Sequence, residues 1–159
     1  MSVSSDGIIA YGIHFDEEQI ENLPWLGDDG DTDIEDWWID VVHGYKPPFE
    51  IFNKDGDYIG GVKPPQSRID EYFNHRRSFT DALPKLPVEM VIHCSYECPM
   101  YIMAIPETKM EVWRGYPKPI PDGFIHRNPE WDNILIGFCK KYGIEMPDKP
   151  AWWLTSLYG

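Results

Sequence analysis

The signals that start and stop a helix over residues 128–143 constrain this fold more than any other feature of the sequence. Asn128 is typical of a helix N-cap, Pro129 of the first helical position, and Gly143 of the residue after the last turn. The inner face of this helix is expected to carry Trp131, Ile134, Leu135, Phe138 and Tyr142. A helix with such an apolar face has to pack on another layer of the fold.

A second helix is predicted to begin at Thr32, because Thr32 and Glu35 form the pattern of a capping box. Gly44 stands where a helix commonly ends. Apolar residues recur at helical spacing between these limits: Ile34, Trp37, Trp38, Val41 and Val42. The opposite face is expected to point outward with Asp33, Glu35, Asp36 and Asp40.

The rest of the chain predicts one more helix and several strands. Residues 67–79 have a helical pattern, with Ile69, Tyr72, Phe73 and Arg76 along one face. Strands are expected at 7–15 and 152–158, and hairpins at 49–59 (around Asp55-Gly56) and 88–105 (around 95–99). Helices interspersed with hairpins, without regular βαβ alternation, predict the α+β class with a mixed or antiparallel sheet and about three helices.

The length of 159 residues and the lack of a long linker predict a single α+β domain over residues 1–159. The Pro-rich pieces at 46–48, 63–65 and 117–121 are short enough to be connectors within it. The core is expected to include Trp37, Trp38, Trp131, Ile134, Phe138 and at least one of Trp152 and Trp153.

The net charge of −13 is concentrated in the first third of the chain. Residues 1–45 hold twelve acids and no Lys or Arg, whereas the remainder holds fifteen acids and all fourteen bases. An excess of this kind bears on fields and partners rather than on fold. The candidate binding residues are Asp28, Asp29, Asp31, Asp33, Asp36 and Asp40.

Three interpretations of these acids stay open. They form a solvated face that aids solubility, they pair internally with Arg68, Arg76 and Arg77, or they present a phosphate-like potential to a basic groove of another protein. A calcium loop is disfavoured, because its sixth position would be Ile34 instead of the glycine that the turn requires.

Cofactor and catalytic motifs are absent from the sequence. Gly60-Gly61 belongs to no phosphate-binding loop, and there is neither a Gly-x-Ser-x-Gly elbow nor a His-Glu-x-x-His zinc helix. No cofactor is therefore expected. The basic residues around Arg76 and Arg77 do not outweigh the net negative charge, so direct binding of nucleic acid is not expected either.

The three cysteines, Cys94, Cys98 and Cys139, are predicted to be unbridged and without a structural metal, because their number is odd and no secretory signal precedes them. A cytoplasmic protein without a membrane span is expected. The alternative is a small metal-binding domain or enzyme built around His93, Cys94 and Cys98, with Cys139 or His126 completing a zinc site.

Several segments stand out together. They are residues 5–12 and 153–159, and between them His75-Arg76-Arg77, Pro87-Val88-Glu89 and Cys94-Ser95 with Pro99-Met100-Tyr101. These segments resemble a group of small uncharacterised proteins encoded by tailed bacteriophages and prophages. The resemblance spans nearly the whole chain and implies a phage accessory protein that works in the host bacterial cytoplasm. Its residues look structural and carry over no catalytic role, while small acidic proteins of this origin often inhibit host defence enzymes such as nucleases.

The sequence therefore favours an interaction protein over an enzyme. We expect it to bind and inhibit a bacterial host protein, as an acidic nucleic-acid mimic acting against a defence system. The expected partner is a basic host protein or a nucleic-acid-binding complex, contacted by the six candidate acids. A phage structural or assembly component is the remaining alternative.

Overall fold

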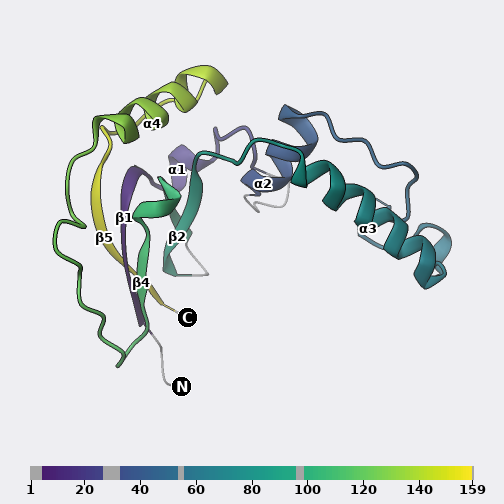
Figure 1. Ribbon diagram of the computed structural model, residues 1–159, viewed down its shortest axis with the longest axis horizontal. Helices are drawn as coiled ribbons and strands as arrows, with labels where there is room; N and C mark the ends of the chain where they lie inside the picture. Colours follow the sequence, from purple (N-terminus) through teal and green to yellow (C-terminus); the bar gives the residue numbers. More distant parts are fainter. Residues whose placement is uncertain (1–4, 27–32, 54–55, 96–98, 159) are drawn as a thin grey trace. The chain divides into compact units, whose positions relative to one another are not determined.

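The computed structural model describes residues 5–26, 33–53, 56–95 and 99–158, and these form two compact units (Figure 1). Unit 1 takes in the chain up to Ile34 and from Leu86 onward, and unit 2 is the contiguous stretch Glu35–Lys85. A five-stranded mixed sheet together with helices confirms the predicted α+β class. That residues 1–159 act as a single domain stays a prediction.

All of the described strands belong to unit 1. They are β1 (Ser5–Phe15), β2 (Glu89–Ser95), β3 (Pro99–Ala104), β4 (Met110–Val112) and β5 (Ala151–Tyr158). Their order is β3-β2-β5-β1-β4, with an additional pairing between β3 and β1. The first and last predicted strands and the hairpin over 88–105 are thus confirmed.

Strand β1 organises the sheet because it pairs along both edges. One edge pairs with β5, while the other pairs with β4 at Gly7–Ile9 and with β3 at Gly12–Phe15. Strand β2 pairs with β3 and, at its end, with β5. The pairs β1–β3, β3–β2, β2–β5 and β5–β1 therefore form a closed cycle. Gly12 lies where β1 changes partners, and a Cβ atom there would be 2.3 Å from the backbone oxygen of Met103, so only glycine fits.

Side chains alternate between the two faces of β1, and both faces are largely buried. One face joins a cluster of Ile8, Ala10, Val91, Ile102 and Ala104, against which Trp153 and Leu157 pack. The other face carries Ile9, Tyr11, Ile13 and Phe15, all buried. Such burial on two sides explains why the stretch 7–15 is a nearly continuous apolar run in the sequence.

The predicted helix over 128–143 is confirmed as α4 (Pro129–Tyr142). The Asn128 side chain accepts a hydrogen bond from the Glu130 backbone (3.0 Å), and Gly143 has the left-handed conformation of a C-terminal cap. The hydroxyl of Tyr11 on β1 donates to the Asp132 carboxylate (2.5 Å), and the Tyr11 ring lies 5.4 Å from Trp131. Helix α4 is thereby tied to β1.

The prediction for one residue of the inner face of α4 is wrong. Trp131, Leu135 and Phe138 are buried as expected, but Ile134 is exposed and Cys139 is buried in its stead. Both residues lie at the borders of the apolar stripe, three and eight positions after Trp131, where a rotation of the helix by a fraction of a turn decides which border is covered. Trp152 and Trp153 on β5 are half-buried.

Unit 2 consists of helical turns and one long helix. Its elements are most of α2 (Ile34–Trp37), a π-turn η1 (Trp38–Val42), a 3₁₀ turn η2 (Ile59–Gly61) and α3 (Gln66–Asp81). The hairpin predicted over 49–59 is present as a single bridge between Phe52 and Tyr58. The start of the first predicted helix at Thr32, and Asp55 of the hairpin turn, lie outside the described residues.

The π-turn overturns one detail of the predicted core. Val41 was expected on the buried face, yet it is exposed, whereas Ile39 is buried and Val42 is half-buried. The backbone N–H of His43 donates to the oxygen of Trp38, five residues earlier (3.1 Å). This wider turn places the residue five positions after Trp37, and not the residue four positions after it, on the same face. Trp37 and Trp38 are buried as predicted.

Candidate functional site

The six candidate acids fall into three groups. Asp28, Asp29 and Asp31 lie outside the described residues. Asp33 is exposed just before α2. Asp36 and Asp40 both contact the guanidinium of Arg76.

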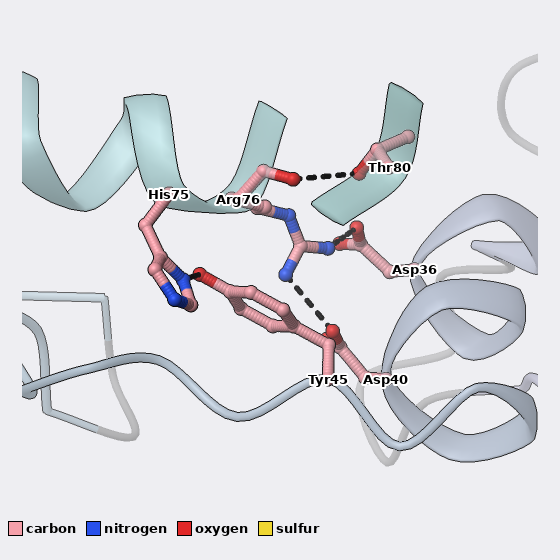
Figure 2. Close-up of polar contacts among 6 residues, drawn as sticks. All are labelled: Asp36, Asp40, Tyr45, His75, Arg76 and Thr80. Atoms are coloured by element: carbon pink, nitrogen blue, oxygen red, sulfur yellow. Dashed lines mark hydrogen bonds and ion pairs between the residues drawn. The ribbon is translucent and has the colours of Figure 1, made fainter. Parts of the chain in front are cut away.

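Figure 2 shows how Arg76 of α3 reaches two carboxylates of α2 and η1. Its Nη1 donates to Asp40 Oδ1 at 2.9 Å, and its Nη2 donates to Asp36 Oδ1. The two acids are four residues apart, so one turn presents both to a single guanidinium. Burial by itself would lower the pKa of Arg76, but Asp40 and Asp36 raise it above its usual value. The cation is therefore held between its partners.

Tyr45 closes the other side of this cluster. The Arg76 guanidinium carbon lies 5.1 Å from the centre of the Tyr45 ring, and His75 Nδ1 lies 3.3 Å from the Tyr45 hydroxyl (Figure 2). Burial, followed by the charge of Tyr72, raises the pKa of the Tyr45 hydroxyl, so it stays neutral. Thr80 donates to the backbone oxygen of Arg76 at 3.0 Å and steadies the same turn of α3.

For Asp36 and Asp40, two of the six candidate acids, the interpretation of internal pairing is confirmed. Of the three arginines considered for it, Arg76 pairs with acids, whereas the Arg68 guanidinium lies 4.2 Å from the centre of the Phe49 ring. Sequence reasoning named Arg76 but missed Tyr45. The signal that could have found the pairing is the four-residue spacing of Asp36 and Asp40 opposite a helix with an arginine on its apolar side.

Most of the unbalanced charge lies in unit 1. Unit 1 holds 18 acids and seven bases, a net charge of −11, whereas unit 2 holds nine acids and seven bases, a net charge of −2. Helix α1 (Glu17–Ile20) and the residue after it expose Glu17, Glu18 and Glu21. Among the described residues, none of these three forms an ion pair. Their charge is therefore directed to solvent.

A hollow of about 270 Å³ lies beside α1. Two carboxylates, two amides and three apolar residues line it: Glu18, Glu145, Gln19, Asn22, Leu23, Ile144 and Pro147. Glu145 follows α4 and comes from a distant part of the sequence, so local patterns could not associate it with α1. Carboxylates and amide oxygens beside apolar side chains in one hollow suit the cationic end and aliphatic stem of a lysine or arginine side chain.

Of the three residues of the alternative site, His93, Cys94 and Cys98, the structure describes the first two. His93 is buried inside the strand cycle, its Nδ1 lies 2.9 Å from Thr155 Oγ1, and its ring centre is 5.0 Å from that of His14. Burial, followed by His14, lowers the pKa of His93, so its ring is neutral. Cys94 is a free thiol with a left-handed backbone (φ 74°), and Cys98 lies outside the described residues.

Of the two proposed fourth ligands, Cys139 is not set up to bind a metal. Cys139 is a free, buried thiol, and burial raises its pKa to about 11, which keeps it protonated. The His126 Nδ1 lies 2.8 Å from the backbone oxygen of Gly123. In the part of the chain that the structure describes, no three His, Cys, Asp or Glu residues are grouped so as to hold a metal ion.

Comparison with known proteins adds no homologue: no protein-family model, no curated protein and no solved structure matches this chain. None of the helices among the described residues has the length and apolar character needed to cross a membrane.

Proposed function

We propose that this chain is an interaction protein that binds a basic surface of another protein through the acidic segment of unit 1. Residues 1–34 hold nine acids and no Lys or Arg, and this is the observation that carries the proposal. The exposed carboxylates of α1 support it, because none of them forms an ion pair within the part of the chain that the structure describes. Complementary charge of this kind accelerates and orients association with a basic partner.

The candidate acids divide their roles in this proposal. Asp28, Asp29, Asp31 and Asp33 precede α2 and continue the charge of α1 along the chain. Asp36 and Asp40 chiefly hold Arg76, so we assign them a smaller share of the binding. The hollow beside Glu18 and Glu145 would accept one lysine or arginine side chain of the partner.

The biological role that fits this chemistry is inhibition of a host protein by a phage-encoded accessory protein. A basic groove that normally holds DNA or RNA would be occupied by regularly placed carboxylates in the place of phosphates. The partner class is therefore a nucleic-acid-binding host protein, such as a component of a defence system acting in the bacterial cytoplasm.

The test is capture of a partner from bacterial lysate, identification of that partner, and a binding titration with the purified pair. Affinity should fall steeply as salt rises, because charges more than about 10 Å apart are screened at 0.1 M ionic strength. A variant with Glu17→Gln, Glu18→Gln and Glu21→Gln, and a second with Asp28→Asn, Asp29→Asn and Asp31→Asn, should each weaken binding.

A matched control removes the same number of charges elsewhere. Glu50→Gln, Glu71→Gln and Asp81→Asn change exposed acids of unit 2 that form no ion pair among the described residues. Equal loss of affinity in the control and in the two test variants would show a response to net charge alone. Unchanged affinity in both test variants would refute the proposal.

A further inference from the structure

One part of unit 1, around the edge strand β4, leaves large apolar side chains uncovered. Leu154 of β5 is 82% exposed, and Trp113 and Tyr116, which follow β4, are 70% and 77% exposed. Single exposed apolar residues are common on proteins, but a contiguous group marks a surface that binds something.

The apolar residues here are contiguous. One hollow of about 450 Å³ is lined by Glu111, Val112, Trp113, Tyr116 and Lys118. A second, of about 130 Å³, lies over Gly7–Ile9 and shares Val112 and Lys118 with the first. We call the joined area the β4 surface; it comprises Met110, Val112, Trp113, Tyr116, Ile120 and Leu154 around Lys118.

The register of the strands explains why this area is open. Trp152 on β5 pairs with Tyr11 on β1, and this row lies against Trp131 of α4. Leu154 lies two residues farther along the same face of β5 and pairs with Ile9, which in turn pairs with Met110. Because Leu154 is exposed, α4 covers the row of Trp152 and Tyr11 but does not extend over the row of Leu154, Ile9 and Met110.

The segment 109–118, which supplies most of the β4 surface, has a net charge opposite to that of the rest of unit 1. Residues 109–118 contain Lys109, Arg114 and Lys118 against the single acid Glu111. Among the described residues, Lys109 and Lys118 form no ion pair, and Lys118 Nζ makes only a long contact (3.4 Å) with the Glu111 backbone oxygen. A partner carboxylate would therefore meet two lysines that have no acid partner among the described residues.

We propose that the β4 surface binds an extended protein segment in which carboxylates alternate with apolar side chains. Trp113, Tyr116 and Leu154 would cover the apolar side chains, and the lysines would pair with the carboxylates. An extended segment fits because β4 pairs with β1 alone among the described strands, which leaves the backbone of Glu111 at a free edge. The three cations of residues 109–118, within a unit of net charge −11, are a poor match for the repeated phosphates of a nucleic acid.

This surface is distinct from the acidic segment of the proposed function. β4 pairs with the first half of β1, whereas α1 follows the other end of β1, and Figure 1 shows the two at opposite ends of that strand. Within β1, residues 8 and 15 are about 23 Å apart at roughly 3.3 Å per residue, which is well beyond the screening length of about 8 Å at physiological salt. The two surfaces can therefore attract partners of opposite charge.

The test uses three fluorescent probes: a short end-blocked peptide in which Glu and Val alternate, the same peptide with Lys in place of Glu, and an oligothymidylate. Fluorescence anisotropy should show binding of the Glu/Val peptide alone, and weaker binding as salt rises. Absence of binding, or an equal affinity for the Lys/Val peptide, overturns the proposal. Preferential binding of the oligothymidylate overturns it in favour of single-stranded nucleic acid.

Variants locate the binding on the protein. Trp113→Ala and Leu154→Ser change exposed side chains, so the fold should be kept, and each should weaken binding about tenfold. Lys118→Glu should weaken it similarly, while Lys149→Glu, an equal change at an exposed loop residue, should leave it unchanged. Wild-type affinity in all three test variants overturns the proposal. So does a wild-type dimer, seen by sedimentation, that Leu154→Ser dissociates, because a second copy would then be the occupant.

Discussion

The two long helices of this protein, one in each unit, contribute to their units in different ways. Helix α3 in unit 2 has 16 residues and buries only Ile69, whereas α4 in unit 1 has 14 residues and buries Trp131, Leu135, Phe138 and Cys139. Apolar burial holds α4, while α3 relies on an arginine between two carboxylates and on ring contacts such as Tyr45 with Phe79 (5.1 Å). Helix length is therefore a poor guide to how much a helix adds to a core.

The largest effect should come from removing a core side chain of α4. Leu135→Ala deletes a fully buried side chain and should lower the free energy of unfolding by about 2–5 kcal/mol. Ile134→Ala, at the adjacent exposed position, should cost less than about 1 kcal/mol. Urea denaturation of the two variants measures the difference. Equal losses would mean that the face of α4 has been assigned wrongly.

A smaller effect is expected in unit 2 when Arg76 loses its charge. Arg76→Gln removes the contacts with Asp36 and Asp40, whose side chains are 60% and 44% exposed, so water already screens both pairs. We expect a loss of about 1–2 kcal/mol, seen as faster hydrogen exchange along α3. Arg77→Gln, an exposed neighbour on the same helix, should change exchange little. If amides of α4 lost as much protection as those of α3, the distinction between the two helices would fail.

A weaker, pH-dependent effect should be confined to the strand cycle of unit 1. Burial, followed by His14, lowers the pKa of His93 below its usual value of 6.5, and the Thr155 hydroxyl also faces the ring. The unfolded chain therefore takes up this proton first as the pH falls. Stability from this group is complete above about pH 6.5 and decreases as the pH drops toward the folded-state pKa.

Urea midpoints measured between about pH 8 and pH 5 would show this slope. His93→Gln should flatten it, whatever its effect on stability at neutral pH. His126→Gln, which changes an exposed ring outside the strands, is the control variant. A slope that survives in His93→Gln would assign the pH dependence to other groups.

The smallest effect is expected at the π-turn. Val41→Ser alters an exposed side chain and should change the free energy of unfolding by no more than about 0.5 kcal/mol. Ile39→Ala, in the same turn, removes a buried side chain and should cost more than Val41→Ser by at least about 1 kcal/mol. Thermal unfolding of the two variants compares them. A larger loss of stability in Val41→Ser than in Ile39→Ala would contradict the π-turn and indicate a regular α-helix through Val42.

Local signals predicted the elements whose structure depends on neighbouring residues. Asn128, Pro129 and Gly143 set the limits of α4, and the apolar run over 7–15 is β1. The predictions of burial were wrong at residues that lie between the buried and the exposed face of a helix. Val41 is exposed because the hydrogen bond from His43 to Trp38 widens the turn, and Ile134 is exposed because of the orientation of α4 about its own axis. Neither is encoded by spacing alone.

Features that join distant residues could not be predicted. The pairing of β1 with β3 and β5, which closes the strand cycle, depends on segments far apart in the chain. The acidic set was located by counting charges, but the capture of Asp36 and Asp40 by Arg76 depends on how α3 packs. Likewise the sequence alone does not show that Trp113 and Leu154, both of apolar character, are exposed.

The closed strand cycle also bears on how the protein is made. Trp153 of β5 donates to the backbone oxygen of Gly12 in β1, 141 residues earlier (3.0 Å). At a translation rate of roughly 5–20 residues per second, β1 waits some 7–28 s for this partner. Unit 2 is contiguous in sequence and can form during that interval. Until β5 has been made, one edge of the apolar strand β1 stays unpaired, and such an edge is open to pairing with other chains.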